Sequence, residues 1–175
     1  MGLAHYILAS LNDENDLFFM NIYSLLDNST ILAGLKVKNK EELLNEMVDA
    51  LSDDVTNEQL EEIRKSVFER EDIMSTGVGK NLAIPHGKVK SIEKNYASFA
   101  ILKDPIDYDS IDGEPVKMVF LLAGPESKNS THIKLLSRIS RLMNSAAFRE
   151  ALSECTTAEE IYKAFHAEEE RYFGN

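Results

Sequence analysis

The most constraining feature of this sequence is an apolar run near the middle of the chain, VKMVFLLA at residues 116–123. A nearly continuous apolar run of this length is typical of a central β-strand that is buried on both faces. Other strand-like and helix-like segments surround it, and the two kinds neither alternate strictly nor segregate. With 175 residues, the chain has room for one domain and a substantial core. The sequence therefore predicts an α/β protein with a mixed sheet.

Two further β-prone runs are expected to form strands, at residues 31–37 and 96–102. The residues Lys103-Asp104-Pro105 are expected to interrupt the second of them, because proline cannot donate to a strand ladder. A turn is expected at Asp112-Gly113, before the central run begins.

Several segments carry apolar residues at helical spacing, and most of them follow a capping residue. The expected helices are residues 40–52 capped by Asn39, residues 57–70 capped by Thr56 or Asn57, residues 132–144 capped by Ser130 or Thr131, residues 146–152, and a last helix capped by Thr156 or Thr157 with Glu160 in a capping box. The expected core face of the third helix is Ile133, Leu136, Ile139, Leu142 and Met143, with Leu135 beside it.

The stretch TGVGKNLAIPHGK at residues 76–88 is the strongest candidate for a functional site. Residues 82–84 are apolar and predict a short buried strand, which Pro85 is expected to end because it has no N–H to donate. His86 would then lie at the strand end, beside the open backbone of Gly87. A histidine placed in this way is a candidate for chemistry, although a lone strand-end histidine more often only closes a turn.

Two other residues have both a structural and a functional interpretation. Arg70 lies near a helix C-terminus, where the helix dipole favours a surface cation, but its guanidinium could also bind two phosphate oxygens at once. His132 lies in the first turn of an expected helix, where free N–H groups attract anions. A lone histidine there is more often a capping or packing residue.

Composition and motifs exclude several other functions. The net charge of −11 argues against nucleic-acid binding, and Cys155 is the only cysteine, which excludes a disulfide within the chain and a multi-cysteine metal site. The sequence GVGK at residues 77–80 is not a P-loop, no zinc motif surrounds the histidines, and no nucleophile elbow is present. No apolar run is long enough to span a bilayer and no signal peptide is evident, so we expect a cytoplasmic protein without membrane insertion.

The run REDIMSTGVGKNLAIPHGK resembles the signature of the fructose/mannitol-type (type 2) EIIA proteins of the bacterial phosphotransferase system, and HIKLL at residues 132–136 resembles a second motif of that family. The resemblance extends from about Met20 to about Phe165. It implies a sheet of about five strands with helices on both sides. It also implies that His86 carries a phosphoryl group on Nε2, with Arg70 and His132 in the same active site.

The resemblance further implies how a phosphoryl group would be held. Nδ1 of His86 should donate a hydrogen bond, for which a backbone carbonyl is a suitable acceptor. The hydroxyl of Thr76 and backbone N–H groups near Gly77, Gly79 and Gly87 are expected to bind the phosphoryl oxygens. No metal ion and no diffusible cofactor is implied. The expected donor is phospho-HPr, a small carrier protein that docks around His86.

Two functions remain open within this family. A nitrogen-type EIIA is a regulator that binds other proteins in a phosphorylation-dependent way, whereas a sugar-transport EIIA passes the phosphoryl group to a fructose- or mannitol-type EIIB. A single EIIA unit without an attached EIIB or EIIC favours the nitrogen-type regulator. Residues 20–175 are expected to form the EIIA domain. Residues 1–19 are outside the resemblance, and are an appended helix, a translation-start artefact or an expression remnant.

Overall fold

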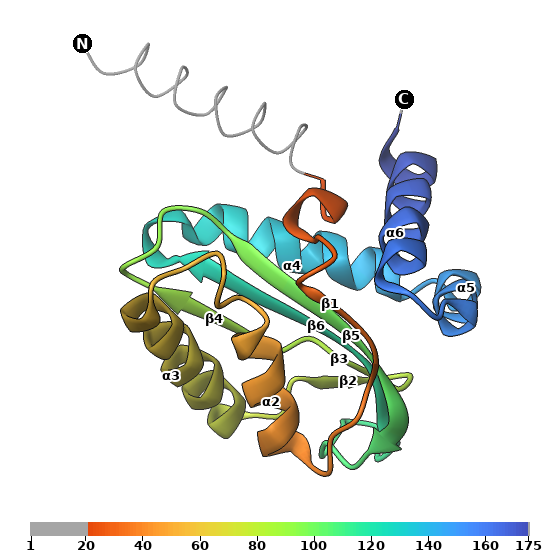
Figure 1. Cartoon of the computed structure of the whole chain (residues 1–175), viewed down its shortest axis with the longest axis horizontal. Helices are drawn as coiled ribbons and strands as arrows, with labels where there is room; N and C mark the ends of the chain where they lie inside the picture. Colours follow the sequence, from red (N-terminus) through yellow and green to blue (C-terminus); the bar gives the residue numbers. More distant parts are fainter. Residues whose placement is uncertain (1–20, 175) are drawn as a thin grey trace.

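The computed structural model describes residues 21–174, which form an α/β domain with a mixed sheet (Figure 1). In chain order the elements are a 3₁₀ helix η1 (Tyr23–Leu25), β1 (Ile31–Leu35), α2 (Lys40–Asp49), α3 (Asn57–Ile73), β2 (Gly77–Gly79), β3 (Leu82–Ala83), β4 (His86–Val89), β5 (Tyr96–Ile106), β6 (Val116–Pro125), η2 (Glu126–Lys128), α4 (Asn129–Met143), α5 (Ala146–Glu154) and α6 (Ala158–Phe173). The expected extension at residues 1–19 lies outside the described residues. Within residues 21–174, no helix is both long and apolar enough to cross a membrane.

The sheet has the strand order β1-β5-β6-β3-β2, and β4 also pairs with β6. Pairing is parallel between β1 and β5, between β3 and β6 and between β4 and β6, and antiparallel between β5 and β6 and between β2 and β3. The predicted central strand is confirmed as β6. Residues Met118, Phe120 and Leu122 of β6 face one core, and the residues between them face the other, so both faces of this strand are buried.

The sheet has six strands instead of the expected five or so, because β3 and β4 are two parts of one path along β6. Leu82 pairs with Met118 and His86 pairs with Leu122, so the register is the same before and after the break. Pro85 interrupts the path without ending it, and its carbonyl accepts a hydrogen bond from Leu122 N at 3.0 Å. The predicted strand end before His86 is present, since β3 stops at Ala83, but the chain resumes as a strand with His86 as the first residue of β4, which was not predicted.

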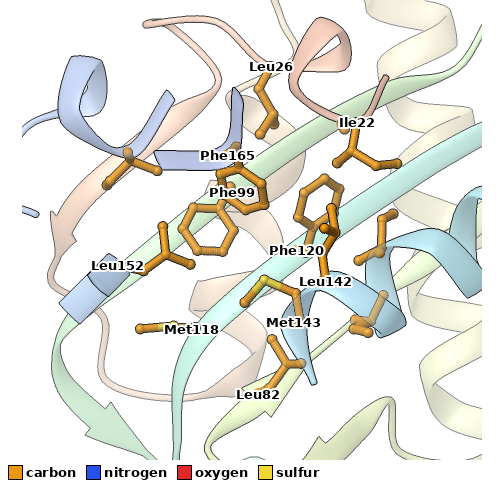
Figure 2. Close-up of a cluster of buried hydrophobic side chains, with 14 of the residues drawn as sticks. Ile22, Leu26, Leu82, Phe99, Met118, Phe120, Leu142, Met143, Leu152 and Phe165 are labelled. Carbon is orange, nitrogen blue, oxygen red and sulfur yellow. The ribbon is translucent and has the colours of Figure 1, made fainter. Parts of the chain in front are cut away.

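Helices cover both faces of the sheet, as the resemblance implied. Helices α2 and α3 lie on one face, and α4, α5 and α6 lie on the other (Figure 1). On the second face the rings of Phe99, Phe120 and Phe165 pack together with edge-to-face or tilted geometry, and the centroids of Phe99 and Phe165 are 4.9 Å apart (Figure 2). Burial of these large side chains is the main force that holds α6 to the sheet.

Caps were predicted for four of the five expected helices, and three of these caps are confirmed. Asn39, Thr56 and Thr157 are the N-caps of α2, α3 and α6, and the last two form capping boxes. Ser145 caps the short helix α5. Each cap accepts a hydrogen bond from a backbone N–H that would otherwise lack a partner.

The fifth helix, α4, differs from the prediction in its start and in its buried face. It begins at Asn129, directly after η2, so neither Ser130 nor Thr131 caps it, and its N-cap residue Lys128 makes no side-chain capping bond. Ile133 was expected in the core but is 58% exposed. The buried face of α4 instead includes His132, Leu135, Ile139, Leu142 and Met143. His132 therefore takes the first position on this face, which was expected for Ile133.

Strand β5 also differs from the prediction, because it continues through Lys103-Asp104-Pro105 to Ile106. The last residue of β1, Leu35, pairs with Leu102, so the described part of the chain provides no strand beside β5 beyond that point on the β1 side. Proline has no N–H to donate, but on that side of β5 there is no strand carbonyl that needs one. Pro105 is thus at an edge position, where a strand tolerates proline.

Candidate functional site

An open pocket of about 540 Å³ lies at the edge of the sheet along β4, between α3 and α4. Arg70 from α3, His86 and Gly87 from β4 and His132 from α4 all line it. Four of the site residues predicted from the sequence are thus brought together from three elements. In Figure 1, α3 and α4 lie on the two sides of β4.

His86 has one ring nitrogen held by the backbone and the other free. Its Nδ1 lies 2.8 Å from the carbonyl oxygen of Ile84. Because a carbonyl can only accept, Nδ1 carries the proton in this hydrogen bond, and the lone pair of a neutral ring is then on Nε2. Nε2 makes no hydrogen bond with any residue between 21 and 174. The predicted Nδ1 geometry is therefore present.

Burial lowers the pKa of His86, and the cations Arg70 and Lys88 lower it further, whereas the Ile84 carbonyl and the Glu71 carboxylate act in the opposite direction. The net effect is a pKa below the ordinary value of 6.5. A neutral imidazole at physiological pH has a lone pair available for nucleophilic attack.

His132 is the fourth residue of α4, and its ring centroid lies 5.9 Å from that of His86. The side chain is buried, and neither ring nitrogen has a hydrogen-bond partner among the described residues. Burial, followed by the effects of His86 and Lys88, lowers the pKa of His132 to about 4. Both histidines of the pocket are therefore neutral at pH 7, and the fixed positive charges of the site come from other side chains.

Two cations border the pocket. Arg70 lies in the last turn of α3 and is half-buried, and its Nη1 donates a hydrogen bond to the Met74 carbonyl at 2.8 Å. Lys88 is a lining residue that our sequence analysis did not single out, and its Nζ donates to Asn129 Oδ1 at 2.7 Å. A signal was available, because residues two apart on a strand point to the same side, and Lys88 is two residues after His86.

Gly87 lines the pocket and also allows α3 to pack directly on β4. A Cβ atom at Gly87 would lie 2.7 Å from Ser66 Oγ and 3.0 Å from the backbone nitrogen of Val67. Ser66 Oγ accepts a hydrogen bond from Lys88 N and donates one to Lys88 O, so it satisfies both backbone groups on the free edge of β4. Helix α3 thereby holds the strand that carries His86.

The structure does not bring the other three predicted phosphate-binding residues to this pocket. Thr76 is 4% exposed, and its hydroxyl bonds to Glu71 and Tyr108 instead of facing His86. Gly77 and Gly79 lie in β2, where added Cβ atoms would meet Ser110 and Asp112 respectively. Close approach of neighbouring atoms therefore explains both glycines, and these neighbours are loop residues after β5.

Fold and site together define a class of protein, an α/β domain that presents a neutral imidazole to a pocket lined by two cations, Arg70 and Lys88, and by two carboxylates, those of Glu69 and Glu126. The chain belongs to the family described as phosphoenolpyruvate-dependent sugar phosphotransferase system, EIIA 2, whose model matches residues 24–168. It is accordingly a phosphocarrier domain of the EIIA type 2 family, as the sequence resemblance indicated.

Relatives within this family have different names. The chain is 38% identical over 143 residues to the "Nitrogen regulatory protein" of Bradyrhizobium diazoefficiens, with 82% of this chain and 93% of the relative covered. It is 35% identical over 142 residues to the "PTS system fructose-specific EIIABC component" of Bacillus subtilis, with 81% of this chain but only 22% of that longer protein covered. The crystal structure of the nitrogen regulatory protein IIA-Ntr from Neisseria meningitidis has a TM-score of 0.76 and 28% identity, covering 82% of this chain and 98% of that one.

Proposed function

We propose that His86 accepts a phosphoryl group from an HPr-like phosphocarrier, and that the protein is a nitrogen-type regulator whose binding to target proteins depends on this modification. The observation that carries the first part is the orientation of His86, whose Nδ1 is bound to the Ile84 carbonyl at 2.8 Å and whose Nε2 is left to a pocket with two cations. Residues 20–175 are the proposed EIIA domain, and residues 1–19 an extension to it.

In the proposed reaction, the Nε2 lone pair attacks the phosphorus atom of the donor's phosphohistidine in line with the bond that breaks. A new N–P bond forms as the donor's N–P bond is cleaved, and the donor imidazole leaves with the electron pair of that bond. The contribution of the protein is positioning and neutralisation of charge on the three phosphoryl oxygens. Arg70 and Lys88 supply positive charge, and the buried ring of His132 borders the same space.

The nitrogen-type role is supported by similarity to nitrogen regulatory proteins over almost their whole length. The alternative, a sugar-transport EIIA that passes the phosphoryl group to a fructose- or mannitol-type EIIB, is supported by the fructose-specific relative at a comparable identity. A dianion on His86 would act on a regulatory target through electrostatics, because it would repel an acidic surface or would need to be desolvated within a packed interface.

The phosphorylation site is tested by incubating the protein with phosphoenolpyruvate, enzyme I and HPr and mapping the acid-labile phosphate. We expect label on His86 alone and none in His86→Ala. His132→Ala is the matched control, because it removes the other imidazole of the pocket and keeps the acceptor. Label on His132, or label that persists in His86→Ala, would refute the assignment.

The two roles are separated by comparing enzymatically phosphorylated and unphosphorylated protein. A regulator retains different proteins in the two states, since a modification acts only through differential binding. A transport protein transfers its phosphoryl group rapidly to a sugar-specific EIIB. Identical partners in both states together with rapid transfer to such an EIIB would overturn the regulatory role and favour the alternative.

A further inference from the structure

A buried carboxylate lies just behind the pocket, one residue after Arg70. Glu71 is in the last turn of α3 and is 7% exposed. Both carboxylate oxygens lie 3.1 Å from Thr76 N, and the Thr76 hydroxyl donates a further hydrogen bond to Oε2. The same helix turn thus places the charge of Arg70 at the pocket and the carboxylate of Glu71 in the interior.

The charge of Glu71 is compensated within the protein. Lys40 Nζ at the start of α2 lies 2.6 Å from Oε1, and the Tyr108 hydroxyl donates to Oε2 at 3.3 Å. Burial and the nearby carboxylate raise the pKa of Tyr108 well above its ordinary value, so its phenol remains a hydrogen-bond donor. The carboxylate thus has a cation and several hydrogen-bond donors around it, as buried polar groups require.

From this carboxylate, a chain of hydrogen bonds leads to the ring of His86. Glu71 binds the backbone N–H and the hydroxyl of Thr76. The Thr76 carbonyl accepts a hydrogen bond from Ile84 N at 3.0 Å. The Ile84 carbonyl in turn accepts the hydrogen bond from His86 Nδ1 at 2.8 Å. Each bond fixes the backbone group that makes the next one.

We propose that Glu71 is a positioning residue for His86, and that it fixes the Nδ1–H tautomer and the ring orientation of His86 through the backbones of Thr76 and Ile84. In other sites a carboxylate binds a histidine directly and orients its ring. Here the backbones of Thr76 and Ile84 lie between the carboxylate of Glu71 and the ring of His86. Its consequence for phosphoryl transfer rests on the proposed function, whereas its consequence for the tautomer can be measured in the unphosphorylated protein.

Electrostatics act in the same direction as the geometry. Burial lowers the pKa of His86 most strongly, with Arg70 and Lys88 adding to this, and the negative charge of Glu71 opposes them. His132 of α4, also beside the ring, is neutral at pH 7 because its pKa is about 4. The carboxylates of Glu69 and Glu126 line the same pocket, and Glu71→Gln leaves both of them in place. Loss of the Glu71 charge should therefore lower the pKa of His86 further.

The test is Glu71→Gln in the 175-residue chain, with the ¹⁵N resonances of the His86 ring measured by NMR as a function of pH. We expect a mixture of Nδ1–H and Nε2–H tautomers and a lower His86 pKa. Phosphoryl transfer from phospho-HPr should slow by about 10–100-fold, the range typical for loss of a group that orients a functional histidine. Glu71→Asp should recover part of this rate, because it retains the charge.

Two variants control for charge and for stability. Asp72→Asn removes the neighbouring exposed carboxylate and should leave the His86 tautomer and rate as in wild type. Tyr108→Phe removes the contacts of the phenol hydroxyl with Glu71 and with Thr76 Oγ1 without breaking the chain to His86, so it should lower the unfolding midpoint and leave the tautomer unchanged. Thr76→Val removes only the hydroxyl bond to Glu71 and keeps the backbone N–H bonds, so it should change the tautomer less than Glu71→Gln does. Glu71→Asp, whose shorter side chain moves the carboxylate away from Thr76 N, serves as the second test if Glu71→Gln does not fold.

The proposal is overturned if folded Glu71→Gln, or folded Glu71→Asp in its place, retains the wild-type His86 tautomer, pKa and transfer rate. It is also overturned if Tyr108→Phe disturbs the tautomer as strongly as Glu71→Gln does, since the role would then be one of general stability. If wild-type protein accepts no phosphoryl group, the proposed function fails, and the NMR comparison still decides whether Glu71 positions His86.

Discussion

Acidification should destabilise this protein in part through His132. Its ring is 3% exposed and has no hydrogen-bond partner among the residues that the structure describes. Burial, followed by the effects of His86 and Lys88, lowers its pKa from 6.5 to about 4. In the unfolded chain the same imidazole is in water and titrates near the ordinary value.

The sign and size follow from the two pKa values. Because the folded pKa is below the unfolded one, the unfolded state binds the proton more tightly in acid. The free energy of unfolding therefore retains this contribution above pH 6.5, loses it progressively as the pH falls, and loses no more of it below about pH 4. One pKa unit corresponds to about 1.4 kcal/mol, so the loss between pH 7 and pH 4 is about 3 kcal/mol.

The assay is urea unfolding followed by circular dichroism at pH 7, 6, 5 and 4, for wild type and for His132→Gln, which cannot ionise. We expect wild type to lose about 3 kcal/mol more than the variant over this range. Carboxylates also titrate in this range. One of them is Asp27, whose pKa is lowered by its hydrogen bonds with Ser29 and Thr30. Their contribution to the free energy of unfolding is the same in both proteins, so it cancels in the difference. Parallel pH profiles would refute the reasoning.

Three further substitutions test other parts of the structure. Arg70→Lys keeps the charge but loses the planar guanidinium, and should slow phosphoryl transfer by about 100–1,000-fold, or about 2.7–4 kcal/mol, in rapid-quench kinetics with the fold unchanged. Gly87→Ala would place a Cβ 2.7 Å from Ser66 Oγ and should lower the free energy of unfolding by about 1–3 kcal/mol in urea titrations. Arg138→Met leaves the carboxylate of Glu169, which is 2% exposed, without its cation. It should cost close to the lower end of about 3–5 kcal/mol, because two backbone N–H groups still bind that carboxylate.

Each of these expectations has a clear contrary result. Wild-type kinetics in Arg70→Lys would show that Arg70 is only a surface residue at the end of a helix. If Gly87→Ala costs as much in a Ser66→Ala background as in wild type, the clash with the serine is not its cause. If the double variant Arg138→Met with Glu169→Gln is no more stable than Arg138→Met alone, the unpaired carboxylate does not explain the loss.

Most of the secondary structure could be predicted from local sequence, and the errors have common causes. Caps such as Asn39 and Thr56 were identifiable because a cap and its helix are neighbours in the chain. The continuation of β5 through Pro105 was not, because it depends on where the neighbouring strand β1 ends. Similarly, the burial of His132 and the exposure of Ile133 depend on which side of α4 meets the sheet.

The sequence by itself determined the family, the central strand and the three residues Arg70, His86 and His132 that the pocket brings together. These follow from local patterns and from a motif that can be read without coordinates. The tertiary structure decided the surroundings of those residues. Thr76, predicted to bind phosphate, instead bonds to the buried carboxylate of Glu71, and Lys88 and Ser66 border the site without having been predicted. The physical reason is that hydrogen bonds and burial are satisfied between segments far apart in the chain, so the direction of a side chain depends on contacts that no local pattern contains.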